Sequence, residues 1–220
     1  MVVKYMNFKE IAENIKNKFS KTELKVFDSI QCFDSICLAS MGHNDTEGYQ
    51  IFTPDFIVKD MCAAIGDDIL DFSKNVLEPT SGDGAFTVYI LLRRLEKALK
   101  GDNFELDSLR ALSTIYSIEM DKELIEKQRN NILTAITLFL KDHKIEVSDG
   151  YLDVFKCIIV KNFMWAMFNS DNPIDAGLFG TEVAYEMPKA EKNVFNPLDM
   201  PVWDINENGI SVHEEGVEIW

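Results

Sequence analysis

A glycine-rich turn next to an acidic residue is the part of the sequence with the clearest chemical potential. The stretch VLEPTSGDGAF, residues 76–86, places Glu78 and Pro79 just before Gly82 and Gly84. Glycine lets the backbone adopt positive φ and approach a ligand closely, and a helix that starts after the turn aims its amides at an anionic group. A carboxylate at Glu78 would repel a pyrophosphate but pairs well with an ammonium group. These residues favour an amino-acid conjugate over a dinucleotide as the ligand.

Further polar residues fall at the ends of two more predicted strands. Glu119 closes the strand in LSTIYSIEMD, where it suits two hydrogen bonds from a ribose diol, and Met120 offers an adaptable apolar wall for a purine. Asp149 closes KIEVSDG, where it suits a hydrogen bond from an exocyclic amine. Ligands bind beyond the carboxyl ends of parallel strands. Ammonium, ribose and adenine together indicate S-adenosylmethionine.

The elements that must position these residues alternate along the chain. Apolar residues at helical spacing predict helices over residues 86–101 and 121–140. Strands are predicted at residues 76–77, 112–119 and 144–150. Strands that alternate with helices favour a parallel, doubly wound α/β sheet of the Rossmann-like type.

Three regions are predicted along the chain. Residues 1–47 form an N-terminal helical region, residues 48–169 a ligand-binding core, and residues 170–220 an irregular C-terminal segment with a terminal hairpin within 209–220. The apolar run over 151–169 fits either a strand through Val160 or one long buried helix, because periodicity does not distinguish them.

The core is expected to open with a short helix. Thr53 suits its N-cap and Pro54 its first turn. Its predicted buried residues are Ile57, Met61 and Ile65.

Composition limits the classes of partner. Lys plus Arg total 22 against 37 Asp plus Glu, a net charge of −15, which opposes the attraction to phosphate that most nucleic-acid binding uses. Contact with DNA would need a local basic patch or a partner protein.

No run of 18 apolar residues occurs, and the first residues carry charges that a signal peptide lacks, so a soluble, cytoplasmic protein without a membrane segment is predicted. The four cysteines show no C-x-x-C spacing, which predicts free thiols and no metal site.

Three motifs in this order resemble a known family. GYQIFTPDFIVKDM, VLEPTSGDGAF and SIEMD look like the amino-terminal part of the class I S-adenosylmethionine-dependent N6-adenine DNA methyltransferases, which include type I modification subunits and gamma-class enzymes. The resemblance covers roughly residues 48–150. It implies a class I methyltransferase fold with an N-terminal helical extension, and a cofactor pocket. In that pocket the methionine end of the cofactor would lie against Thr53 and Pro54, and its amino group would lie against Glu78. The ribose would lie against Glu119 and the adenine near Asp149. The further cofactor-binding residues that the resemblance implies are Pro79, Gly82, Gly84, Phe86 and Met120.

The chain departs from this family at the catalytic motif. The family carries Asn, Asp or Ser followed by Pro-Pro and an aromatic residue, which together hold the target amine and stack on a flipped base. No such tetrapeptide occurs here. The stretch Asn162-Phe163-Met164-Trp165 has matching ends without the prolines, so Asn162 and Trp165 are the candidate catalytic residues.

Several functions therefore stay open. The first is an adenine-N6 DNA methyltransferase of a restriction-modification system, which contacts DNA directly or through a partner subunit. The second is a catalytically inactive binding subunit or an acidic inhibitor of a DNA modification or restriction system. Methylation of a protein or a small molecule is a third. A nicotinamide oxidoreductase is disfavoured, because Thr87 stands where the third glycine of the dinucleotide motif belongs.

Overall fold

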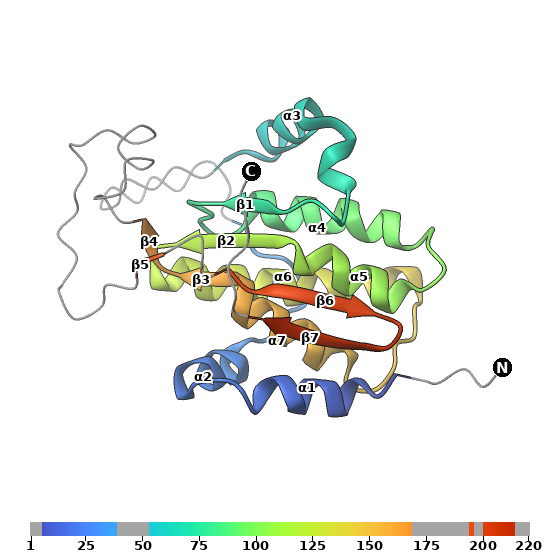
Figure 1. Cartoon of the computed structure of the whole chain (residues 1–220). Coiled ribbons are helices and arrows are strands. Elements are labelled where there is room, and N and C mark those ends of the chain that lie inside the picture. The colour runs from blue at the N-terminus through green and yellow to red at the C-terminus, as the bar shows by residue number, and fades with distance from the viewer. Residues whose placement is uncertain (1–5, 39–52, 169–193, 196–199, 214–220) are drawn as a thin grey trace.

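A small parallel sheet lies at the centre of the fold (Figure 1). The structure, a computed structural model, describes residues 6–38, 53–168, 194–195 and 200–213. The sheet contains β1 (Val76–Glu78), β2 (Ile115–Glu119) and β3 (Phe163–Trp165), all parallel and in the order β1-β2-β3. In the register of the sheet, Glu119 pairs with Trp165. The predicted parallel α/β arrangement is confirmed.

Helices make both connections between the strands. The first connection contains α4 (Ala85–Ala98) and α5 (Phe104–Ser113), and the second contains α6 (Lys122–His143) and α7 (Tyr151–Asn162). The side chain of Asp121 caps α6 by accepting hydrogen bonds from two first-turn amides. Helix α5 is an additional element, between the first predicted helix and the second predicted strand.

The two faces of the sheet are packed differently. Ile115 and Phe163 belong to the main core, which they share with the helices. Tyr116 and Ile118 point to the other face, where they form a smaller cluster with Met200. The parallel sheet contains the strands β1, β2 and β3, and no fourth strand joins it among the described residues.

The predicted third strand is wrong. Residues 144–150 form no strand, and β3 instead follows the buried helix α7. The alternation of Ile145 and Val147 imitates a strand because both side chains pack against the core from an irregular segment. The apolar run that periodicity left ambiguous is helical up to Asn162, and extended pairing begins at the next residue.

The N-terminal helical region packs onto the core. Helices α1 (Phe8–Lys16) and α2 (Lys21–Ser29) both contact α7. The ring of Phe8 meets that of Tyr151 edge to face at 5.9 Å between centroids, and Lys161 forms an ion pair with Glu23 at 2.5 Å. The predicted region boundaries near residues 47 and 169 lie outside the described residues.

Helix α3 (Asp55–Ile65) begins one residue later than predicted. Pro54 occupies its N-cap position, and no side-chain hydrogen bond caps the helix. The predicted buried face is also wrong, because Val58 and Cys62 are buried while 54% of Met61 and 60% of Ile65 are exposed. The main contacts of the helix among the described residues are with α4 and the short 3-10 helix η1 (Gly66–Leu70), which cover a narrow stripe of its surface.

A β-hairpin closes the described part of the chain. Strands β6 (Val202–Asn206) and β7 (Gly209–His213) pair in antiparallel fashion, and the hairpin lies against α5, where Arg110 donates a hydrogen bond to the carbonyl of Ile205 at 2.9 Å. The predicted hairpin within 209–220 shares β7 with it, and residues 214–220 lie outside the described residues. Two short strands, β4 (Met167–Phe168) and β5 (Val194–Phe195), form a separate parallel pair. None of the described helices is both long and apolar enough to cross a bilayer.

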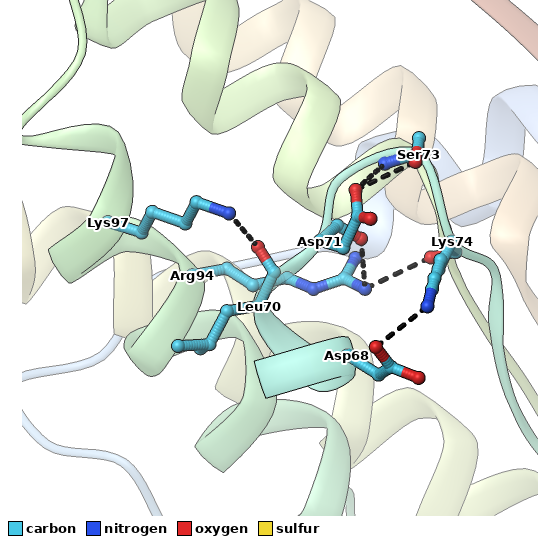
Figure 2. A network of polar contacts seen from close by, with 7 residues as sticks. All are labelled: Asp68, Leu70, Asp71, Ser73, Lys74, Arg94 and Lys97. Carbon is cyan, nitrogen blue, oxygen red and sulfur yellow. Dashed lines mark hydrogen bonds and ion pairs between the residues drawn. The ribbon is translucent and has the colours of Figure 1, made fainter. Parts of the chain in front are cut away.

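A buried arginine fixes the segment that enters β1 (Figure 2). Arg94 of α4 is fully buried, and burial lowers the pKa of its guanidinium to about 10. Figure 2 shows this guanidinium against the carbonyls of Asp71 and Lys74, at 3.2 and 3.1 Å, while Lys97 reaches the carbonyl of Leu70 at 2.9 Å. The remaining acceptors of Arg94 are the carbonyls of Ile69 and Ala111 and the hydroxyl of Thr114, at 2.7, 3.0 and 2.6 Å. Arg94 therefore joins α4 to both segments that lead into the central strands.

Candidate functional site

The glycine loop, residues 79–84, leaves the carboxyl end of β1 and enters α4. Its backbone is tied to the neighbouring strand by a hydrogen bond from the amide of Ser81 to the carbonyl of Ile118 at 3.0 Å. Gly82 and Gly84 adopt φ of 56° and 94°, conformations that residues with a side chain rarely take. The predicted strand, turn and helix are confirmed at this point of the chain.

Glu78 provides the most unusual group of the site. Its Oε2 atom is buried and has no hydrogen-bond partner among the described residues. Burial raises the pKa of this carboxyl to about 8; a bond from the backbone amide of Thr87 opposes the rise, and the charges of Glu119 and Asp83 add to it. A buried oxygen without a donor is unfavourable, so a ligand that brings a hydrogen-bond donor to this atom would gain binding free energy.

Glu119 lies at the carboxyl end of β2 and is only 8% exposed. Its Oε2 accepts a hydrogen bond from the amide of Gly82 at 2.7 Å, and its Oε1 accepts one from the amide of Asp121 at 2.9 Å. The carboxylate thus braces the glycine loop against the start of α6. Each oxygen keeps a second lone pair that a ligand hydroxyl can use.

The site carries opposite polarities at neighbouring points. Glu78, Asp83 and Glu119 bring three carboxyl groups together, and Lys127 forms an ion pair with Asp83 at 3.3 Å. Gly84 is the N-cap of the helix that follows, and the first turn of that helix contains no acidic residue. The amide of Thr87 in this turn is bound to Glu78, so an anion at the positive end of the helix would use the amides that precede it. An α-amino acid carries the ammonium and the carboxylate that match these two points.

A polar network from α6 supports the glycine loop from behind. Gln128 is fully buried, and its Oε1 accepts hydrogen bonds from the hydroxyls of Ser81 and Ser117 at 2.9 and 3.0 Å. Its Nε2 donates to the hydroxyl of Thr87 at 2.9 Å, and that hydroxyl donates to the carbonyl of Gly84 at 3.1 Å. The loop conformation is therefore set by side chains that lie far away in the sequence.

Substitution of Gly84 by alanine is expected to disrupt this support. A Cβ atom at Gly84 would lie 2.6 Å from Cγ of Gln128, and the positive φ adds strain. We expect Gly84→Ala to lower the free energy of unfolding by about 3 kcal/mol. Gly82→Ala is the matched control: a Cβ atom there meets nothing within 4 Å, so only about 1 kcal/mol of backbone strain is expected. Urea denaturation of both variants measures the difference, and equal losses would contradict the close packing of Gly84 on Gln128.

An aromatic residue stands at the end of the third strand. Trp165 is the last residue of β3, beside Glu119 in the register of the sheet. Its indole Nε1 donates to the carbonyl of Met120 at 2.9 Å, and the ammonium of Lys122 lies 5.7 Å from its ring centroid. Met120 is 46% exposed. Met120, predicted to bind the cofactor, and Trp165, predicted as a catalytic residue, therefore both lie next to Glu119, and we term this pair the apolar wall.

Four other predicted residues belong to the glycine loop or lie at the starts of helices α3 and α4. Pro79 directly follows β1, and Phe86 lies in the first turn of α4, where its ring packs against the main core. Thr53 and Pro54 are half-buried and precede α3. Helix α3 approaches the site through Cys62, whose thiol pKa is raised by burial and by the charge of Glu78.

Asp149 does not lie at this site. It is exposed in the turn before α7 and forms an ion pair with Lys9 of α1 at 2.5 Å. In Figure 1, β1 and β2 point to the left, whereas α1 begins on the right. The placement of Asp149 at the end of a third strand is wrong because residues 144–150 form no strand.

Asn162 also lies at the opposite end of the sheet. It directly precedes β3, and its fully buried amide donates to the carbonyls of Ser113 and Ile115 at 2.9 and 3.0 Å. Its Oδ1 accepts a hydrogen bond from the indole of Trp203 at 2.8 Å. Three residues of extended strand, about 10 Å, separate this position from the pair of Glu119 and Trp165. The structure therefore does not bring the two candidate catalytic residues together.

Residue types alone did not identify the supporting groups of the site. Gln128 and Asn131 lie on the buried side of α6 among apolar residues such as Ile125 and Ile132. The sequence signal for these two residues was an amide side chain on an otherwise apolar helix face, because a buried polar side chain requires a hydrogen-bond partner. No cluster of metal-ligating side chains occurs among the described residues.

Comparison of the chain with protein-family models, with curated proteins and with solved structures gave no match.

Proposed function

We propose that this chain binds S-adenosylmethionine at the carboxyl ends of β1, β2 and β3, as an adenine-N6 methyltransferase-like protein. The observation that carries the proposal is the buried, unpartnered Oε2 of Glu78 beside the glycine loop. The α-ammonium of the cofactor supplies the missing donor, and its carboxylate faces the amino end of α4. The sulfonium adds a second positive charge to a site that holds three carboxyl groups.

The remainder of the cofactor fits the neighbouring residues. The ribose hydroxyls donate to the free lone pairs of Glu119, and the adenine stacks on the wall of Met120 and Trp165. This assignment replaces Asp149, which pairs with Lys9 at the other end of the sheet.

Tryptophan fluorescence tests the position of the adenine. The chain holds three tryptophans, among which Trp165 lies at the proposed adenine wall and Trp203 is bound to Asn162. Addition of S-adenosylmethionine is expected to quench the emission of the wild type and of Trp203→Phe, and to leave that of Trp165→Phe unchanged. An equal quench in both variants would place the adenine elsewhere.

A binding role without methyl transfer is the second candidate function. Two observations favour it: the chain lacks the catalytic tetrapeptide, and the amide of Asn162 is occupied by structural hydrogen bonds. The net charge of −15 suits an acidic subunit or inhibitor that contacts the basic surface of a DNA-acting partner.

Two measurements separate these functions. Isothermal titration calorimetry with S-adenosylmethionine tests the site, and Asp149→Asn serves as a control that should bind as the wild type does. Transfer of a tritiated methyl group to unmethylated DNA tests catalysis. Binding with transfer supports the methyltransferase, and binding without transfer supports the second candidate. Absence of binding would contradict both as cofactor-binding proteins.

A further inference from the structure

The segment of residues 31–38, termed the strap, crosses α6 beside the glycine loop. It forms no helix or strand, and side chains of α6 hold its backbone. The amide of Gln31 donates to Oδ1 of Asn130 at 2.8 Å, and the amide of Phe33 donates to the hydroxyl of Thr134 at 3.0 Å. The strap is therefore attached mainly through polar residues of one helix.

Asn131 joins the strap to the glycine loop. Its side chain is 2% exposed, and its Nδ2 donates to the carbonyl of Asp83 in the loop and to that of Cys37 in the strap, both at 3.0 Å. Its Oδ1 accepts a hydrogen bond from the amide of Cys37 at 2.9 Å. Both hydrogens of the carboxamide are thus used, one on each segment.

We propose that Asn131 is a positioning residue that couples the strap to the ligand-binding loop, so that S-adenosylmethionine binding at the loop also orders the strap. The identity of the ligand rests on the function proposed above; the coupling itself rests on the three hydrogen bonds of one side chain.

The geometry of the loop explains how binding is transmitted. The carbonyl of Asp83 belongs to the peptide that leads into Gly84, the N-cap residue of α4. A ligand that restrains this peptide also restrains the carboxamide bound to it, and the same carboxamide holds Cys37 at two points. Coupling between two sites is reciprocal, so loosening of the strap must weaken ligand binding by the same factor.

Two neighbouring asparagines provide a matched pair of variants. Asn131→Asp keeps the acceptor for the amide of Cys37 but removes both donated bonds and places a carboxylate against two carbonyl oxygens. Asn130→Asp makes the same chemical change on the same helix, and it preserves the contact with Gln31 because Asn130 acts there as an acceptor. Thr134→Val removes one strap contact without touching the loop.

Hydrogen exchange of the full chain without ligand tests the shared side chain directly. Amides of the strap and of residues 81–88 are both expected to exchange about tenfold faster in Asn131→Asp than in the wild type. Thr134→Val should speed exchange in the strap alone, and Asn130→Asp should change neither. If the loop amides of Asn131→Asp exchanged at the wild-type rate, the proposal would be overturned, even if the strap amides exchanged faster.

Exchange with saturating S-adenosylmethionine tests the transmission. Protection is expected in the loop and in the strap of the wild type and of Asn130→Asp. In Asn131→Asp the protection of the strap should disappear and affinity should fall about tenfold. Protection of the loop without any change in the wild-type strap would overturn the coupling while leaving the proposed function intact. If S-adenosylmethionine protected no amide and gave no heat of binding, it would not be the ligand of this site. The proposal that its binding orders the strap would then be wrong as well.

Discussion

Replacement of Glu78 by glutamine is expected to stabilise the unliganded protein and to weaken ligand binding at the same time. The carboxyl group is buried, its Oε2 lacks a partner among the described residues, and its pKa is raised to about 8. Each pKa unit corresponds to about 1.4 kcal/mol. The side chain keeps some contact with solvent, so we expect Glu78→Gln to raise the free energy of unfolding by about 2 kcal/mol at pH 8.

The sign of this effect follows from proton linkage. Because the folded protein holds the proton of Glu78 more tightly than the unfolded chain does, stability falls as pH rises from the ordinary value of 4.5 to about 8. Glu78→Gln should therefore differ little from the wild type below pH 4.5 and should gain most at pH 8. Denaturant titrations across this range measure the gain. Glu146→Gln, at an exposed position, is the control and should change stability by less than about 0.5 kcal/mol.

Ligand affinity should fall in Glu78→Gln, whereas stability should rise. A neutral amide at residue 78 cannot form an ion pair with the α-ammonium of the ligand, and loss of a buried charged partner costs about 2 to 5 kcal/mol. We expect the affinity for S-adenosylmethionine to fall on the order of 100-fold in Glu78→Gln. A variant that is both more stable and weaker in binding identifies a residue retained for its ligand. If stability and affinity both stayed at the wild-type values, Glu78 would be an ordinary exposed carboxylate.

Replacement of Arg94 by methionine is expected to cause the largest loss of stability in the chain. Methionine fills similar space, but five acceptors on two segments lose their donor, and four of these are backbone carbonyls. Each buried polar group left without a partner costs about 1 to 3 kcal/mol, and partial access of water reduces the sum. We expect the free energy of unfolding to fall by about 4 kcal/mol.

The neighbouring arginine provides the control for this prediction. Arg93 is exposed and pairs with Glu96 within the same helix at 2.5 Å. Arg93→Met should change stability by less than about 0.5 kcal/mol. Urea titrations of both variants give the comparison, and Arg94→Lys should recover only part of the loss, because an ammonium cannot reach all five acceptors. A loss below about 1 kcal/mol in Arg94→Met would show that water replaces the guanidinium without penalty.

The central part of the fold was predictable because its signals are local. The stretch before Gly82 and Gly84 is a short apolar strand, the glycines take positive φ, and the next residues have helical periodicity. Glu119 follows a run of buried residues and ends β2 as predicted. In these places, propensity, periodicity and turn chemistry agree with the tertiary structure.

The third strand and the support of the loop were not predictable from local patterns. Asp149 follows an alternating segment that is too exposed to be a central strand, and its contact with Lys9 depends on how α1 packs against α7. Asn162 occurs at the right distance from Trp165 in sequence, yet the two lie at opposite ends of a short strand. The roles of Gln128 and Asn131 depend on partners about 40 to 95 residues away.

The pairing of Glu78 with the ammonium of the ligand is tested most directly by counting protons during binding. Calorimetric titration of the wild type with S-adenosylmethionine at pH 7, in two buffers with different heats of ionisation, should show release of close to one proton, because the carboxyl group is mostly protonated before binding. Affinity should rise about tenfold between pH 6 and pH 7, and Glu78→Gln should show neither effect. Binding that releases no proton and is independent of pH, or no binding at all, would contradict the pairing.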